Sequence, residues 1–383
     1  MLRVPAYPAA LKVAETVAGY FARRLADARA RGKDGLAAAP DASTVEAVIN
    51  TAFWASLRRE EGYAPKISLA FLPPEQAEPP LTLSQTLPLD AAALAKLAPA
   101  VERPGIHLGV WHSGDGKELC VWGTTRVIPR LCFVLEVVEP GLLVVKYRRG
   151  RDPGKFANVA VLRGDEVKVV DEAGASLPDC PELLNSLIGF GPSSLAPPDS
   201  VNVLVQLAVS MRAHGRGGTL LVVPSGADSW RDSIRWPAPY SVEPAFPELR
   251  ELLRRGETEA DDPEWQEALR RAVDAVAGLT AVDGAAVINE RSELLAFGAK
   301  ITRREGAARV ERVTLTEPVV GAAAGVVEPA QLGGTRHLSA AQFVQDQQDA
   351  LALVASQDGR FTVFAWSPCE GMVHAHRVET LLL

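Results

Sequence analysis

Two short segments combine the side chains that metal and phosphate chemistry require. The first is Asp283-Gly284-Ala285, which opens an expected strand directly after a helix and the turn at residues 278–280. A carboxylate oxygen is a hard ligand, so Asp283 could bind Mg²⁺ or Mn²⁺. An ordinary turn has the same pattern, because Asp is frequent in turns and the following glycine permits a positive φ. The segment by itself leaves both interpretations open.

The second segment, Gly333-Gly334-Thr335-Arg336-His337, is rich in hydrogen-bond donors. Its two glycines let backbone amides approach a ligand, and we expect a helix to begin at Ser339 with an N-terminus that favours anions. The threonine adds a hydroxyl, and the arginine adds a guanidinium that can donate two hydrogen bonds to one phosphate. The histidine adds a further hydrogen-bond donor. An ordinary loop-to-helix turn with a surface arginine would look the same. Together the two segments predict the minimum for a metal–nucleotide site, a carboxylate and a donor-rich turn.

Two further motifs favour structural roles. The glycine-rich residues 215–218 do not follow a strand, so they predict a turn between a helix and a strand rather than a dinucleotide fingerprint. His374 and His376 could share one face of a strand. No carboxylate or third ligand is evident near them, so we expect solvent-exposed edge residues rather than a zinc site. The phosphate-loop, zinc-protease and serine-hydrolase signatures are absent from the sequence.

Composition limits the class of protein. The chain has 383 residues, of which 47% are hydrophobic and 23% charged, so it is long enough for two or three globular domains and is not a disordered chain. A net charge of −7 argues against broad, nonspecific binding to nucleic acids or anionic membranes. The four cysteines form no CxxC pair, which is typical of a reducing compartment. Without a signal peptide or a long apolar run, we expect a cytoplasmic protein that does not bind a membrane.

The first half has the element order of an α+β domain, which we expect over residues 1–190 with helices first and antiparallel strands after them. Helical spacing of apolar residues predicts a helix over residues 8–31, and Ser43-Thr44 is the predicted N-cap of the next helix. Prolines at positions 73, 74, 79 and 80 predict a turn-rich connection. Runs of β-branched and aromatic residues from position 106 predict consecutive antiparallel strands joined by hairpins. A strand over residues 66–72 and a helix over residues 90–101 complete this half.

The second half alternates between helices and strands. Residues 189–200 are rich in Gly, Pro and Ser and form the best domain boundary. The alternation predicts an α/β domain over residues 199–383, with a mixed central sheet flanked by helices. The expected helices cover residues 201–213, 264–277 and 339–348, and the expected strands cover residues 218–223, 283–288, 294–299, 350–354 and 361–365.

These landmarks, in this order, resemble the diadenylate cyclase domain, the catalytic domain of the DNA-integrity scanning protein and of membrane-bound cyclic di-AMP synthases. A helix runs into a Gly-[Ala/Thr]-Leu-hydrophobic strand, and Asp283-Gly284-Ala285 follows another helix. The family's hydrophobic-Ala-x-Gly, Gly-Thr-Arg-His-Arg and Val-Ser-Glu-Glu segments correspond to residues 294–298, 334–338 and 355–358. The resemblance covers about half of the chain. The first half is similar to the sensor-type domains that accompany some of these cyclases.

The resemblance implies an enzyme that condenses two ATP molecules into cyclic di-AMP and pyrophosphate where two protomers meet across a two-fold axis, and hence a homo-oligomer. Asp283 would hold Mg²⁺ or Mn²⁺ and help to activate the 3′-hydroxyl that attacks the α-phosphate. Gly284 would give the ligand close access to the backbone. No helix-hairpin-helix segment follows, so no nucleic-acid partner is expected. The other nucleotide-binding residues that the resemblance implies are Ala285, Gly334, Thr335, Arg336, His337 and Ser339.

Three departures from the family keep a second interpretation open. Leu338 replaces the second Arg of Arg-His-Arg, and Gln357 stands where a metal-binding Glu is often found. The segment of residues 302–332 is also longer than the family's usual linker. One hypothesis is therefore an active cyclase regulated by its N-terminal domain. The other is a degenerate domain that binds a nucleotide without turnover and acts as a sensor or scaffold.

Overall fold

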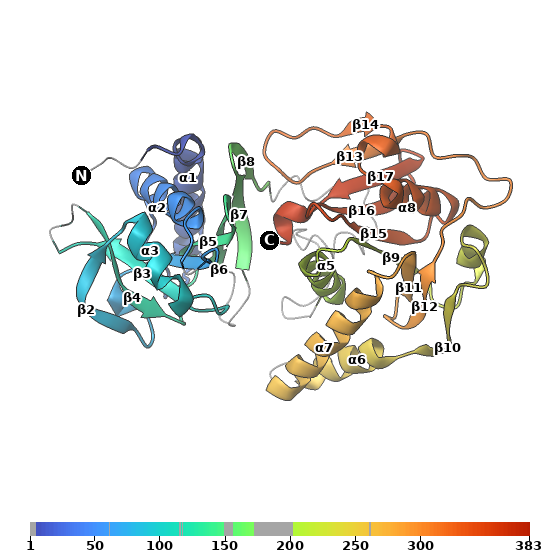
Figure 1. Ribbon diagram of the computed structural model, residues 1–383, viewed down its shortest axis with the longest axis horizontal. Coiled ribbons are helices and arrows are strands. Elements are labelled where there is room, and N and C mark those ends of the chain that lie inside the picture. Colours follow the sequence, from blue (N-terminus) through green and yellow to red (C-terminus); the bar gives the residue numbers. More distant parts are fainter. Residues whose placement is uncertain are drawn as a thin grey trace. The chain divides into compact units, whose positions relative to one another are not determined.

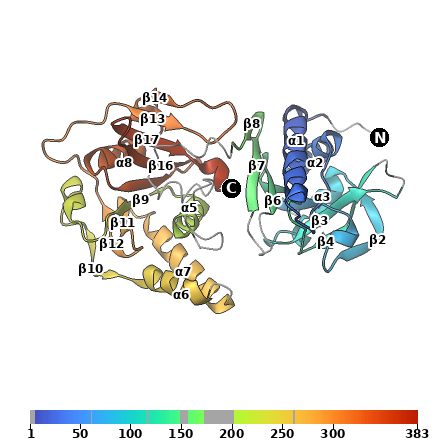
Figure 2. The same cartoon turned by 180° about the vertical axis from the view of Figure 1, so that it is seen from behind.

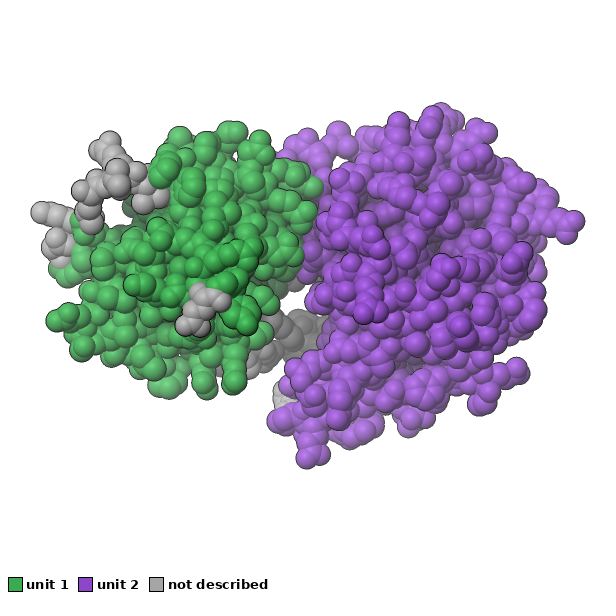
Figure 3. All heavy atoms as spheres, in the orientation of Figure 1, with its two compact units in different colours: residues 1–170, 383 green, residues 171–382 purple. Residues whose placement is uncertain are grey.

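The computed structural model describes residues 5–60, 62–114, 116, 118–148, 156–171, 202–259 and 262–383. The chain divides into two compact units, Met1–Val170 with Leu383 and Asp171–Leu382 (Figure 3). The boundary expected at residues 189–200 lies outside the described residues. The chain combines helices with two mixed sheets, and each unit holds one of these sheets.

The first unit is built on an eight-stranded sheet with the order β2-β4-β3-β1-β5-β6-β7-β8. The strands expected after residue 106 are all present, but not all of those that follow one another in sequence are neighbours in the sheet. The strand β1 lies between β3 and β5 and runs parallel to β3. The turn-rich connection expected at residues 73–80 leads into an unexpected edge strand, β2. The strands are β1 (Ile67–Phe71), β2 (Leu81–Pro88), β3 (His107–His112), β4 (Leu119–Thr125), β5 (Phe133–Glu139), β6 (Leu142–Arg148), β7 (Phe156–Arg163) and β8 (Glu166–Val169).

Three helices, α1 (Pro8–Ala30), α2 (Ala42–Ser56) and α3 (Ala91–Leu97), pack against one face of this sheet (Figures 1 and 2). The buried stripe of α1 includes Val17, Phe21 and Leu25, as its helical spacing predicts. The expected N-cap of α2 is wrong by two residues. Asp41 is the cap, and its carboxylate accepts a hydrogen bond of 2.7 Å from the amide of Thr44.

The second unit is built on a nine-stranded sheet with the order β10-β12-β11-β9-β15-β16-β17-β13-β14. Strands β9 and β11 are parallel, as are β13 and β17, and the other neighbours are antiparallel. The strands are β9 (Gly218–Val223), β10 (Tyr240–Phe246), β11 (Ala285–Asn289), β12 (Leu294–Ala299), β13 (Val313–Thr316), β14 (Gly325–Val327), β15 (Leu351–Ala355), β16 (Phe361–Ser367) and β17 (Met372–Arg377).

Helices cover both faces of this second sheet (Figures 1 and 2). The helices α5 (Val203–Ala213), α6 (Glu248–Glu259) and α7 (Pro263–Leu279) share one apolar core with the sheet, and α8 (Thr335–Asp346) belongs to the core on the other face. The expected mixed sheet flanked by helices is therefore present. The expected start of α8 at Ser339 is wrong, because the helix already begins at Thr335. The sequence analysis also missed α6, β10, β13 and β14, and it considered a strand at β17 only for its two histidines.

Candidate functional site

One edge of the second sheet brings the two chemical segments together. The parallel strands β9 and β11 both begin at this edge, and the antiparallel strand β15 ends there, with Gly218 paired to Ala355. The segment before β11 carries Asp283, and the first turn of α8 carries Arg336. The guanidinium of Arg336 lies over Gly217, where a Cβ atom would come within 2.9 Å of Nη1. Residues far apart in sequence thus meet because three strands share one edge.

Asp283 is the exposed carboxylate of this edge. The side chain is 92% exposed, and its Oδ2 atom forms an ion pair with the ammonium of Lys300, which follows β12. The hydrogen bond and charge of Lys300, and then the charge of Arg336, lower the pKa of Asp283. Asp283 is therefore an anion at neutral pH, paired with Lys300 and further stabilised by the charge of Arg336.

The donor-rich segment is the beginning of α8 rather than a loop before it. Gly334 is the N-cap, and it offers no side-chain hydrogen bond to the first-turn amides. Those amides, and the positive end of the helix dipole, therefore suit an anion. Thr335 is exposed and Arg336 half-buried, so both can contact a ligand outside the sheet.

His337 faces the protein interior. It is 3% exposed, its ring lies 6.1 Å from that of Phe364, and its Nε2 atom has no hydrogen-bond partner among the described residues. Burial lowers the pKa of His337; the carboxylate of Asp358 opposes this, and Arg377 lowers the pKa further. The imidazole is therefore neutral at neutral pH. It would add a hydrogen bond rather than a positive charge to any phosphate that reached it.

Two of the residues implied for nucleotide binding have clear structural roles. Gly284 has a φ of +122°, and a Cβ atom there would overlap the carbonyl carbon of Gly298 on the neighbouring strand. Ala285 is 1% exposed and belongs to the core beneath α8. The close Gly298 backbone accounts for Gly284, and burial in the core accounts for Ala285, so any contact from Ala285 to a ligand would come from its backbone. Ser339, by contrast, lines a cavity beside α8.

The protein's own donors do not form a metal site at this edge. No group of three or more His, Cys, Asp or Glu residues that could hold a metal ion occurs in the part of the chain that is described. Asp283 is a single carboxylate, and Lys300 already pairs with it. Mg²⁺ commonly takes one or two carboxylates and completes its shell with substrate phosphates and water. A metal at Asp283 would therefore have to arrive with a phosphorylated ligand and displace Lys300.

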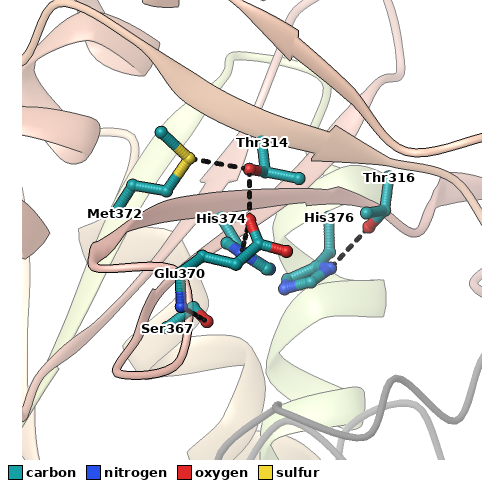
Figure 4. Close-up of polar contacts among 7 residues, drawn as sticks. All are labelled: Thr314, Thr316, Ser367, Glu370, Met372, His374 and His376. Atoms are coloured by element: carbon teal, nitrogen blue, oxygen red, sulfur yellow. Dashed lines mark hydrogen bonds and ion pairs between the residues drawn. The ribbon is translucent and has the colours of Figure 1, made fainter.

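The histidine pair of β17 is a buried hydrogen-bond network, so the expectation of solvent-exposed edge residues is wrong (Figure 4). His374 is 6% exposed and His376 is 2% exposed, because β17 lies inside the sheet between β16 and β13. The expected absence of a nearby carboxylate is also wrong. Glu370 accepts a hydrogen bond of 2.9 Å from Nε2 of His374, and Nδ1 of His376 lies 2.6 Å from the hydroxyl of Thr316. This network ties β13 to β17.

Two residues of the candidate site were missed in the sequence analysis. Lys300 carries no motif, and only its position directly after β12 relates it to Asp283. Gly217 belongs to the glycine-rich turn between α5 and β9, which the sequence predicted correctly as a turn. Its proximity to Arg336 depends on the pairing of β9 with β15, which local sequence does not reveal.

Comparisons with known proteins give a family match to one part of the chain and weak matches to solved structures. No curated protein matches the chain. Two solved structures are 13% identical to it and cover 45% of it. One is a hypothetical membrane spanning protein from Bacillus cereus, with a TM-score of 0.26 over 61% of that chain, which is less than two thirds. The other is a double mutant of DacA from Staphylococcus aureus, with a TM-score of 0.24 over 83% of that chain. Such TM-scores carry no argument about the fold.

Among the described helices, none has both the length and the apolar character that a membrane span requires.

The family model that matches is the "probable sensor domain DACNV", and it covers residues 34–126 within the first unit. Residues 34–126 are thus similar to a sensor domain that occurs in proteins associated with diadenylate cyclases.

Proposed function

We propose that this protein is a diadenylate cyclase in which the first unit regulates the second. The observation that supports this best is the convergence of Asp283 and Arg336 at one sheet edge, close enough for the arginine charge to lower the carboxylate pKa. The resemblance of the second half to the cyclase domain requires this pair. The sensor-domain match at residues 34–126 supplies the regulatory half of the proposal.

The reaction joins the 3′-oxygen of each ATP to the α-phosphate of the other and releases two pyrophosphates. The first-turn amides of α8 and the guanidinium of Arg336 would offset the charge on the phosphates. Asp283 is ionised and could orient a 3′-hydroxyl or a phosphate-bound Mg²⁺ or Mn²⁺. Each chain supplies one such edge, so two chains must pair about a two-fold axis to align two ATP molecules. The substrate would be cytoplasmic ATP.

A second candidate function is nucleotide binding without turnover. The ion pair between Lys300 and Asp283 favours it, because the ammonium occupies the carboxylate that a metal would need. Leu338 and Gln357 also stand where the cyclase family uses charged groups, an arginine and a metal-binding glutamate. Under this proposal the second unit binds ATP or cyclic di-AMP and reports its occupancy to a partner.

One experiment separates the two functions. The full chain is incubated with ATP and either Mg²⁺ or Mn²⁺, and the products are identified by mass spectrometry. The variants are Asp283→Asn and, as a matched control, Asp349→Asn, whose exposed carboxylate lies near the opposite end of β15. Cyclic di-AMP from the wild type and the control, but not from Asp283→Asn, supports the cyclase. Saturable ATP or cyclic di-AMP binding without product supports the binding function. Absence of both binding and product refutes both.

A further inference from the structure

A cavity of about 380 Å³ opens beside α8, next to the candidate site. Its lining includes the apolar residues Ile301 and Leu338 and the hydroxyl-bearing residues Thr302 and Ser339. Two arginines from the segment between β12 and β13 complete the lining together with Gln342. The full set of lining residues is Ile301, Thr302, Arg303, Arg309, Leu338, Ser339 and Gln342.

The loop that carries the two arginines is fixed to α8 by hydrogen bonds. The side chain of Gln342, which is 8% exposed, accepts a bond of 2.9 Å from the amide of Val310 and donates one of 3.0 Å to the carbonyl of Ala308. Asp346, one turn further along α8, accepts a bond of 2.7 Å from the amide of Arg304. Arg303 therefore precedes, and Arg309 lies within, a stretch of backbone that α8 holds in place, and both residues line the cavity.

No ion pair of Arg303 or Arg309 occurs among the residues that the structure describes, and both side chains are exposed. Other arginines of the same unit, such as Arg250 and Arg255, are paired with glutamates. A guanidinium fork fits the oxygens of a phosphate, so two arginines with no ion pair in the described part of the chain suit an anionic ligand at one cavity.

The cavity adjoins the proposed nucleotide site along two elements. Ile301 directly follows Lys300, whose ammonium pairs with Asp283. Ser339 lies about one helical turn after Arg336. A nucleotide whose α-phosphate lies at Arg336 could therefore extend its outer phosphates into the cavity. Leu338, the position at which the second arginine of the family signature is missing, is part of this cavity wall.

We propose that Arg303 and Arg309 bind the outer phosphates of a nucleoside polyphosphate, and that they supply from the inserted loop the charge that Leu338 removes from α8. This inference rests on the proposed nucleotide site, whether or not the nucleotide is turned over. It assigns the ligand class as a nucleoside triphosphate in preference to a monophosphate. The ligand is distinguished by the number of its phosphates beyond the first.

The test measures equilibrium binding of ATP, AMP and inorganic tripolyphosphate to the full chain by calorimetry. The variants are Arg303→Ala, Arg309→Ala and the double variant, and the matched control is Arg304→Ala, since Arg304 is exposed in the same loop but does not line the cavity. Loss of one charge-assisted hydrogen bond weakens binding by about tenfold or more. We expect each single variant to bind ATP about tenfold more weakly than the wild type, with its affinity for AMP unchanged. The control variant should bind ATP as tightly as the wild type does. Adding Leu338→Arg to the double variant should restore part of the ATP affinity.

The outcomes distinguish this inference from the proposed function. If the double variant binds ATP as tightly as the wild type, the inference is overturned and the nucleotide site stands. If the wild type binds tripolyphosphate through the two arginines but binds neither ATP nor cyclic di-AMP, the phosphate subsite stands and the proposed function fails. A wild type that binds ATP and AMP equally well, with no tripolyphosphate binding, also overturns the inference. Unfolding curves of each variant show whether a loss of affinity reflects a loss of fold.

Discussion

His376 should make the second unit sensitive to mild acid. Burial, and then the neighbouring His374, lower the pKa of His376 from 6.5 to about 3. The folded protein therefore keeps this imidazole neutral at pH 4.5, whereas the unfolded chain takes up a proton below about 6.5. The stability that the folded protein has with a neutral His376 is therefore fully present above pH 6.5 and is lost as the pH falls from 6.5 toward 3.

The size of the effect follows from the two pKa values. At pH 4.5 the protonated form of this histidine outnumbers the neutral form by about 100 to 1 in the unfolded chain. This protonation lowers the free energy of unfolding by about 2.7 kcal/mol. Because pH 4.5 lies well above the folded pKa, this figure depends mainly on the unfolded value. At pH 7.5 the same proton contributes less than about 0.1 kcal/mol.

The comparison is between the wild type and His376→Gln, whose amide can keep a hydrogen bond to the Thr316 hydroxyl but does not titrate. Unfolding in urea is monitored through the oxidation of Met211 by peroxide. Met211 is a fully buried residue of α5, so its oxidation reports the unfolding of the second unit. The drop in unfolding free energy from pH 7.5 to pH 4.5 should be about 2.7 kcal/mol larger in the wild type. His112→Gln, on the sheet of the first unit, is the control and should behave as the wild type does. Equal pH dependence in wild type and His376→Gln would refute the reasoning.

Three further predictions concern individual contacts. Gly284→Ala should destabilise the second unit by roughly 2–6 kcal/mol in urea unfolding, through a strained φ and backbone overlap; a loss below about 1 kcal/mol would contradict the packing argument. Asp41→Ala removes the cap on the Thr44 amide. Urea unfolding monitored by circular dichroism should show a free energy of unfolding lower by about 0.5–2 kcal/mol, and an unchanged unfolding midpoint would argue against this cap. Lys300→Met frees Asp283, so titration should show tighter Mn²⁺ binding in the presence of ATP; unchanged or weaker binding would show that Lys300 does not compete with the metal.

Local sequence predicted most of the inner strands of both sheets, because burial requires runs of apolar residues in them. Strands such as β9 and β15 are buried throughout and almost entirely apolar, and their positions were predicted within a residue or two. The edge strands β2 and β10 were missed, since nearly every residue in them is exposed or half-buried and each contains a proline. Their pairing partners lie far away in sequence, so short-range reasoning had no signal for them.

The candidate site was predicted in part for a related reason. Asp283 and Arg336 lie close together as the motif order suggested, but the first turn of α8 was interpreted as a loop because of its glycines. Gly334 is the N-cap, and the residues after it are helical. The inward orientation of His337 depends on packing against Phe364 of β16, which no local pattern indicates. Lys300 was not predicted because its partner is known only once β11 and β12 pair.

The error at His374 and His376 has one cause, the long segment between β12 and α8. Taken without that segment, β17 would be the last strand of the sheet, and its histidines would lie at an open edge. The segment folds back as β13 and β14, pairs in parallel with β17 and thereby buries both imidazoles. Its first part, before β13, brings Arg303 and Arg309 to the cavity beside α8. This one segment thus both covers an edge of the sheet and brings two arginines near Leu338 of α8. A shorter linker could do neither, so we expect the acid sensitivity of His376 and the phosphate subsite to depend on the same segment.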